Sequence, residues 1–261
     1  MNTPTPRSNT IRSILPVSLL ALGLALGACA EDVDRTAEPD DTELEVATTD
    51  GEAEALALKI DAAEFGSLEL GAKIVGPQGP EVKSSLKTAE GNFADITSYV
   101  ACPKGMDKCD PKTAPKGTIY TYVHTVYPGE DNDASTGAGR GNDSSDIEIA
   151  EAFKMLQPAF GFNGVAGYSE LEVEAALDKA ARVVITCHDG SLVWTVNATG
   201  EDNTWEQAEP ITFFWQSTLP PAGPSDVYAI VANYTEATGM GPFPAATAGA
   251  EAGCKAPSTA R

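Results

Sequence analysis

Short runs of alternating or continuous apolar residues, separated by turns rich in glycine and proline, fill most of the chain after residue 60. Alternation with a period of two is typical of a strand with one solvated face, and a short continuous apolar run is typical of a buried strand. The expected strands are residues 65–75, 82–87, 94–101, 117–127, 182–187, 192–197, 211–215 and 227–234. Strands of this length and spacing predict a mostly β fold, and more specifically an antiparallel β-sandwich.

Two of these segments carry additional information. Asp189-Gly190 separates residues 182–187 from 192–197, and this dipeptide favours the type I′ turn of a β-hairpin. Residues 117–127 have apolar side chains on both faces, which indicates a central strand. His124 lies in that strand among tyrosines. We interpret it as a packed, hydrogen-bonded histidine, with a role as ligand or base as the alternative.

Helix signals occur at two places. Ser145 with Glu148, and Ser169 with Glu172, have the spacing of a capping box. They predict short helices over residues 146–156 and 171–181, although the alternation at the start of the second segment also permits a strand. The aromatic and glycine-rich residues between these helices either line a cleft or pack against a sheet edge.

Charge is strongly acidic and uneven along the chain. The 261 residues contain 38 acidic and 17 basic side chains, a formal net charge of −21. Such a surface excludes nucleic acid as an expected partner, because binding to phosphates needs positive charge. Eleven acids and one base, Arg35, lie between Glu31 and Glu54, where no residue is aromatic. We predict that residues 29–58 form a disordered acidic linker, with an arm for cations or a basic partner as the alternative.

The first 29 residues have the organisation of an export signal. Arg7 and Arg12 precede an apolar run over residues 14–26 that is too short to span a bilayer comfortably. The run ends in Leu-Gly-Ala-Cys, with Cys29 as its last residue. This motif resembles the lipobox of bacterial lipoproteins. A plain secretory signal followed by a coincidental cysteine is the alternative.

The lipobox resemblance implies a location and a modification. Residues 1–28 would be removed as a signal peptide, and the thiol of Cys29 would carry a diacylglyceryl group. A second acyl chain on the new N-terminus would be needed for stable attachment, because one chain binds a membrane only marginally. Ala30 follows the cysteine, which by analogy with such lipoproteins favours the outer over the inner membrane. The expected location is therefore the bacterial cell envelope, with the domain in the periplasm or facing the surface.

Four cysteines remain after Cys29. An even number in an exported chain indicates two disulfides, and we favour Cys102–Cys109 and Cys187–Cys254 among the three pairings. Residues 59–244 would then form one β-rich domain, with a flexible tail over 245–261 pinned by Cys254. A zinc site is not expected, because no Cys-x-x-Cys pair occurs.

A long polar loop over residues 128–145 interrupts the strand pattern. Its oxygen-rich side chains are of the kind that calcium needs. The candidate ligands are Asp131, Asp133, Asp143 and Asp146. A flexible loop without metal is the alternative, and no other cofactor is expected.

Known catalytic motifs are absent from the sequence, which contains only two histidines. The last two expected strands resemble the closing strands of immunoglobulin-like and fibronectin-type modules, an architecture that many unrelated functions share. The leading hypothesis is a lipid-anchored envelope protein whose domain binds an envelope protein or a polysaccharide, or has a structural role. The alternatives are a secreted hydrolase of envelope or extracellular polymers, using loop carboxylates with His124, and a calcium-dependent binding module.

Overall fold

The computed structural model describes residues 58–76, 81–89, 91–129, 147–198, 204–206, 209–246 and 253–254. The chain divides into two compact units, Met1–Ala47 and Thr48–Arg261, and every described residue belongs to the second. The predicted signal peptide, Cys29 and all of the predicted acidic linker except Leu58 lie outside this description. No helix within the described ranges has the length and apolar character needed to cross a membrane.

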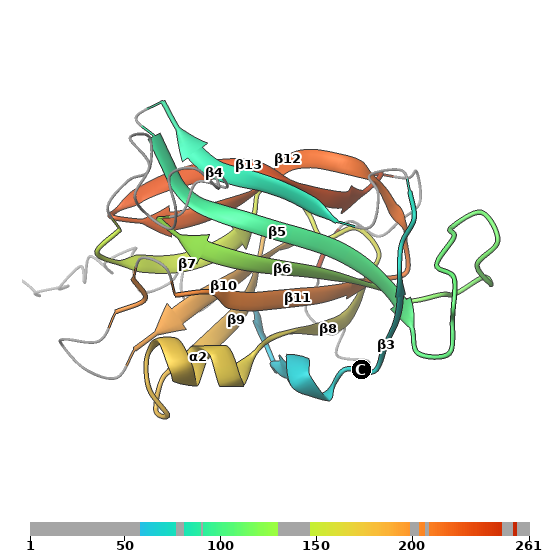
Figure 1. Ribbon diagram of the computed structural model, residues 1–261, viewed down its shortest axis with the longest axis horizontal. Helices are drawn as coiled ribbons and strands as arrows, with labels where there is room; N and C mark the ends of the chain where they lie inside the picture. Colours follow the sequence, from blue (N-terminus) through green and yellow to red (C-terminus); the bar gives the residue numbers. More distant parts are fainter. Residues whose placement is uncertain are drawn as a thin grey trace, which may run out of the picture. The chain divides into compact units, whose positions relative to one another are not determined.

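The described residues form one sheet of 13 strands with one α-helix (Figure 1). The strands are β1 (Leu58–Ile60), β2 (Ala63–Glu64), β3 (Leu70–Lys73), β4 (Val82–Thr88), β5 (Gly91–Pro103), β6 (Tyr120–Pro128), β7 (Ala150–Met155), β8 (Phe162–Tyr168), β9 (Arg182–His188), β10 (Ser191–Asn197), β11 (Ile211–Ser217), β12 (Pro221–Ala232) and β13 (Thr235–Pro244). A 3-10 turn, η1, covers Phe65–Ser67, and the helix, α2, covers Glu170–Ala176.

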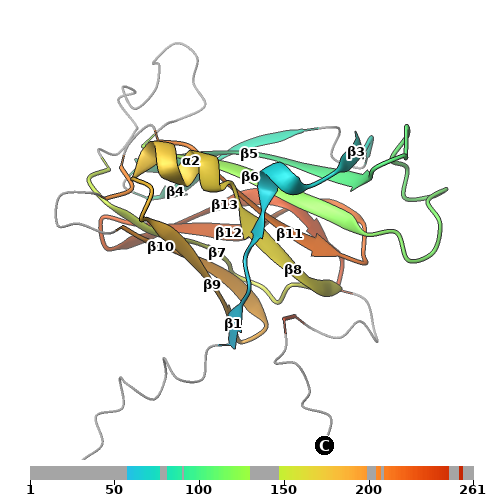
Figure 2. The ribbon, with the colours of Figure 1, turned by 90° about the horizontal axis from the view of Figure 1, so that it is seen from below.

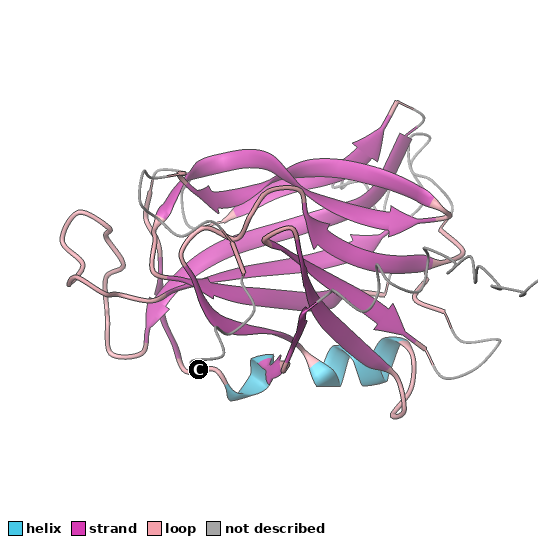
Figure 3. Cartoon of the chain, turned by 180° about the vertical axis from the view of Figure 1, so that it is seen from behind, coloured by secondary structure: helices cyan, strands magenta, loops and turns pink. Residues whose placement is uncertain are grey.

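The strand order is β1-β9-β10-β7-β12-β13-β4-β5-β6-β11-β8-β2, and β3 pairs with β5. The pair β2–β8 is parallel, whereas the other named strand pairs are antiparallel. The prediction of a mostly β fold is confirmed. The prediction of an antiparallel sandwich is met only in part, because the strands link into one large, curled and mixed sheet (Figures 1 and 3).

The contact between β4 and β13 has little regular strand pairing, and we call it the seam. The two strands are paired at a single position, Thr238 with Lys87. The Ser84 hydroxyl adds a hydrogen bond to the carbonyl oxygen of Met240. Gly239 allows the strands to approach closely, because a Cβ atom there would lie 2.4 Å from the Ser85 carbonyl oxygen. The seam divides the strand order into two halves, β1-β9-β10-β7-β12-β13 and β4-β5-β6-β11-β8-β2.

The other junction between the halves is the N-terminal strap, residues 58–64. Leu58 in β1 pairs with Cys187 in β9, and Ala63 in β2 pairs with Gly167 in β8. Because β9 and β8 lie toward opposite ends of the strand order, this short segment connects both ends of the sheet (Figure 2). A Cβ atom at Gly167 would lie 1.9 Å from the Ala63 carbonyl oxygen, so β2 can pair here only against glycine.

Aromatic side chains from both halves fill the space between them. Phe153 of β7 stacks on Phe213 of β11, with ring centroids 5.2 Å apart, and on Tyr228 of β12 at 5.6 Å. Trp194 of β10 is fully buried and donates a hydrogen bond of 3.1 Å from Nε1 to the carbonyl oxygen of Gly167. Large aromatic side chains dominate the energetics of such cores. The core therefore holds the two halves together more than the single paired position at the seam does.

Two predictions from short-range signals, a hairpin and a helix cap, are confirmed. Asp189 and Gly190 have φ angles of 49° and 84° and join β9 to β10, as the predicted type I′ hairpin requires. Ser169 caps α2 and accepts a hydrogen bond of 3.3 Å from the amide of Glu172. The helix ends at Ala176, earlier than predicted.

Three other predictions need correction. The helix predicted over residues 146–156 is wrong, because Ala150–Met155 is strand β7, paired with β10 and β12. The single strand predicted over 65–75 is instead a 3-10 turn followed by β3. The strand predicted over 227–234 begins earlier, because β12 covers Pro221–Ala232, and its pairing with β13 shifts register at two points. For β7, pairing with strands distant in the sequence overrides the local helix signal.

Candidate functional site

Two disulfides fix loops of the domain, and they are the pairs that the sequence favours. Cys102 is bonded to Cys109, with Cα atoms 5.5 Å apart, and Cys187 is bonded to Cys254, with Cα atoms 5.7 Å apart. The amide of Cys254 also donates a hydrogen bond of 2.9 Å to the carbonyl oxygen of Gly190. The second disulfide therefore holds a residue of the C-terminal tail against the β9–β10 hairpin.

The first disulfide ties Cys102, near the end of β5, to Cys109 in the connection between β5 and β6. We call this connection, residues 104–119, the lysine loop. It contains four of the chain's eleven lysines, spaced four residues apart: Lys104, Lys108, Lys112 and Lys116. In Figure 1 this green loop projects beyond the ends of β5 and β6. Such a density of positive charge is unusual for a chain whose net charge is −21.

Hydrogen bonds fix the lysine loop to the neighbouring segment before β4. The amide of Ala72 donates to the carbonyl oxygen of Met106 at 3.0 Å, and the amide of Val75 donates to that of Cys109 at 3.3 Å. Within the loop, Oδ1 of Asp110 accepts a hydrogen bond of 3.0 Å from the amide of Lys112. These contacts and the disulfide hold the lysines at fixed backbone positions.

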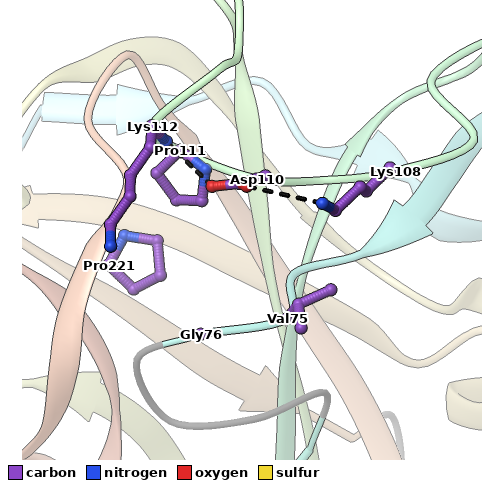
Figure 4. Close-up of a pocket in the computed structure, with 7 residues that line it drawn as sticks. All are labelled: Val75, Gly76, Lys108, Asp110, Pro111, Lys112 and Pro221. Carbon is purple, nitrogen blue, oxygen red and sulfur yellow. Dashed lines mark hydrogen bonds and ion pairs between the residues drawn. The ribbon is translucent and has the colours of Figure 1, made fainter.

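A pocket of about 480 Å³ lies beside this loop (Figure 4). Its lining residues are Val75, Gly76, Lys108, Asp110, Pro111, Lys112 and Pro221. The volume lies in the range of small-molecule sites, which is roughly 300–1,000 Å³. We call it the lysine pocket. It is formed where the lysine loop meets the start of β12, so residues far apart in sequence create it.

The charges in the lysine pocket are only partly compensated. The Lys108 ammonium lies 3.7 Å from Oδ2 of Asp110, and the other oxygen of that carboxylate is engaged by the Lys112 amide. No carboxylate of the described residues lies within ion-pair distance of the Lys112 ammonium. Val75, which is 63% exposed, and the rings of Pro111 and Pro221 form apolar walls.

This combination can bind a ligand that carries a negative charge. An ammonium group attracts carboxylate, sulfate or phosphate as a compact point charge. The proline rings and the valine side chain can make van der Waals contacts with the uncharged part of an anionic ligand. The residues that line the lysine pocket include no histidine, cysteine or serine that could act as a base or a nucleophile.

His124, the candidate base, lies elsewhere. It is fully buried on β6, and its Nδ1 is 2.9 Å from Oγ of Ser98. Its ring packs 4.2 Å from that of Tyr228, centroid to centroid, and burial lowers its pKa from 6.5 to about 3. Nε2 has no hydrogen-bond partner among the described residues. The interpretation of His124 as a packed, hydrogen-bonded histidine agrees with this environment.

The glycine-rich aromatic segment after residue 160 also has a structural role. It forms β8, which lies between β11 and β2 in the sheet. Gly161, at φ 70°, faces the hydroxyl of Ser217, and a Cβ atom there would lie 2.7 Å from it. Of the two interpretations of this segment, packing within the sheet therefore describes the residues of β8.

Two sets of predicted site residues lie outside the described part of the chain. They are the lipidation residue, Cys29, and the calcium ligands Asp131, Asp133, Asp143 and Asp146. Both assignments stay predictions. Within the described ranges, no group of three or more histidine, cysteine, aspartate or glutamate side chains is placed to hold a metal ion.

The lysine pocket is a site that the sequence predictions did not include. The regular spacing of four lysines in an acidic chain is visible in the sequence, but the contribution of Pro221 depends on the fold. Comparison with known protein families, with curated proteins and with solved structures found no match for this chain. What the pocket binds must therefore be inferred from its own residues.

Proposed function

We propose that the protein is a lipid-anchored protein of the bacterial cell envelope whose β domain binds an anionic ligand in the lysine pocket. The anchor is inferred from the lipobox resemblance that ends at Cys29, and the outer membrane from Ala30. Two disulfides support an oxidising compartment. The partner that fits is an envelope polysaccharide or protein that presents carboxylate, sulfate or phosphate groups.

The local reversal of charge is the observation that carries the proposal. An acidic chain repels anions at long range, and yet Lys108 and Lys112 both line one pocket on it. Exposed ion pairs contribute at most about 1 kcal/mol each and weaken with salt. A single anionic unit should therefore bind weakly, near the millimolar range that corresponds to about 4 kcal/mol. A polymer with repeated charges would gain affinity through several contacts.

The fold supplies a rigid base for this pocket. Because the aromatic core packs one half of the sheet against the other, we regard the domain as a sandwich-like scaffold built from one curled sheet. The lysine pocket lies at one end of this scaffold, on a loop closed by a disulfide. Ligand sites are commonly placed on loops that a rigid scaffold positions.

Hydrolysis of envelope polymers is a weaker proposal on this geometry. His124 is enclosed by the core, and its hydrogen-bond partner is a serine rather than a carboxylate. The lysine pocket contains one carboxylate, that of Asp110, whereas glycoside hydrolysis usually uses two. A hydrolase would have to use carboxylates outside the lysine pocket.

A charge-removal experiment tests the lysine pocket. The full chain would be titrated with polygalacturonate, which carries carboxylates, and with uncharged dextran, using isothermal titration calorimetry. Replacing Lys108→Gln and Lys112→Gln together should weaken polygalacturonate binding by about tenfold, since two favourable contacts are lost.

The matched control is Lys83→Gln with Lys179→Gln, which removes the same charge from two exposed lysines outside the pocket. The control should bind within about twofold of the wild type. Equal losses in both variants would indicate nonspecific attraction, and unchanged binding in the pocket variant would show that the ligand binds elsewhere.

A separate experiment tests the anchor. Cys29→Ala should move the protein from the membrane fraction to the soluble fraction after cell lysis, because the acylated thiol is absent. Metabolic labelling with a fatty acid would follow the modification directly. Continued membrane association of the unlabelled variant would contradict lipid anchoring.

A further inference from the structure

A second pocket lies over the seam between β4 and β13, apart from the residues of the lysine pocket. Its volume is about 520 Å³, and its polar lining includes Lys87, Asn92 and Asp226. These residues come from three strands, β4, β5 and β12, and Gly239 and Met240 of β13 complete the wall. We call it the seam pocket.

Two irregularities in strand pairing meet at the seam pocket. The β4–β5 register shifts between Leu86 and Lys87, and the β12–β13 register shifts between Asp226 and Tyr228. Bulges of this kind redirect side chains and often occur beside binding sites. Here each shift borders a charged residue of the pocket. The regular pairing of β4 with β13 is limited to one position, so the two shifts lie where the backbone ladder is least regular.

The polar side chains of the seam pocket have unused hydrogen-bonding capacity. Lys87, Asn92 and Asp226 make no side-chain hydrogen bond or ion pair with any other described residue. The Lys87 ammonium can donate hydrogen bonds, the Asn92 amide can donate and accept them, and the Asp226 carboxylate can accept them. Met240, 49% exposed, adds an apolar surface to the same pocket.

These groups select a class of ligand. The charges of Lys87 and Asp226 balance, so the seam pocket does not favour an anion as the lysine pocket does. Saccharide hydroxyls both donate and accept hydrogen bonds, and the C–H faces of a sugar ring can pack on a methionine side chain. We propose that the seam pocket is a binding site for a neutral saccharide, distinct from the anionic site at the lysine pocket.

Saturation-transfer difference NMR on the full chain tests this proposal with three neutral disaccharides as probes: cellobiose, maltose and N,N′-diacetylchitobiose. At least one should bind with a millimolar Kd, as expected for a shallow polar site. The double substitution Asn92→Ala with Asp226→Ala should weaken that binding by about fivefold or more, since two hydrogen-bonding groups are lost. Both side chains are at least partly exposed, so the fold should be retained, which the unfolding temperature would check.

The matched control is Asp61→Ala with Asn197→Ala, which removes the same two side-chain types from exposed positions outside the pocket. Unchanged binding in the control supports the proposal. Absence of binding by all three disaccharides up to about 20 mM, or equal loss in both double variants, would overturn it. The Lys108→Gln, Lys112→Gln variant separates the two sites: retained disaccharide binding supports the seam pocket, and lost binding would place the sugar in the lysine pocket instead.

Discussion

At the scale of single residues, the burial of His124 makes the stability of the domain dependent on pH. Burial lowers the pKa of the folded state to about 3, whereas in the unfolded chain the usual value of 6.5 applies. Below pH 6.5 the unfolded state therefore binds a proton that the folded state does not. Stability is lost as the pH falls from 6.5 towards 3, by about 1.4 kcal/mol per pH unit.

Replacement of His124 by glutamine should remove this dependence. Between pH 7 and pH 5, the free energy of unfolding of the wild type should fall by about 2 kcal/mol more than that of His124→Gln, measured by urea denaturation. The comparison is between two pH values within each protein, so any constant packing cost of the substitution cancels. His188→Gln is the control, because His188 is 69% exposed and should leave the wild-type dependence in place. An unchanged dependence in His124→Gln would contradict the assignment.

At the scale of elements, the two disulfides should contribute unequally to stability. Cys102–Cys109 spans a sequence separation of 7 and Cys187–Cys254 one of 67. On a chain-entropy model these closures stabilise the domain by about 2 and about 4 kcal/mol, because a longer loop restricts the unfolded chain more.

Double alanine variants of each disulfide test this difference. Loss of Cys187–Cys254 should lower the midpoint of urea unfolding more than loss of Cys102–Cys109. The variant without Cys102–Cys109 should nevertheless weaken polygalacturonate binding, because the lysine loop loses its covalent link to β5. A larger stability loss from the shorter loop would show that native contacts, rather than chain entropy, dominate.

Elements defined by local chemistry are those that the sequence predicts well. The Asp189-Gly190 hairpin, the Ser169 cap of α2 and the four paired cysteines depend on close neighbours or on counting. The sequence predicts a helix in place of β7 because a capping-box spacing precedes it, whereas the strand pairs with β10 and β12 and Phe153 is buried against aromatic rings of other strands. Local propensity is a weak guide when tertiary pairing opposes it.

The same limit applies to the candidate sites. The lysine spacing is present in the sequence, and the sequence also predicts the disulfide between Cys102 and Cys109. Neither pocket could be predicted, because one needs Pro221 beside the lysine loop and the other needs Asp226 across the seam from Lys87. Both juxtapositions result from the order of strands in the sheet.

At the scale of the whole domain, Gly167 controls whether the N-terminal strap can pair with β8. Gly167→Ala would place a methyl group against the Ala63 carbonyl and the Phe214 ring, at 1.9 and 2.6 Å. We expect a loss of about 3 kcal/mol or more in the free energy of unfolding. Trypsin should also cleave faster after Lys59, a residue of β1, if the strap detaches.

Gly76→Ala is the control for this substitution. A Cβ atom there meets nothing within 4 Å, and Gly76 is not among the glycines with positive φ. Its stability and cleavage rate should match the wild type. If Gly167→Ala unfolds like the control, the close approach of β2 to β8 is not required for the fold.

The strap also affects the order in which the sheet can form. Leu58–Ile60 and Ala63–Glu64 are synthesised before the other described strands, but their partners are β9 and β8. Folding slows when contacts join residues far apart in sequence. If the chain crosses a membrane with its N-terminus first, the strap arrives on the far side long before its partners. The strap can then pair only after β9 has followed, and the sheet can be completed only after β13, which ends at Pro244. The topology itself therefore delays completion of the sheet until export is nearly finished.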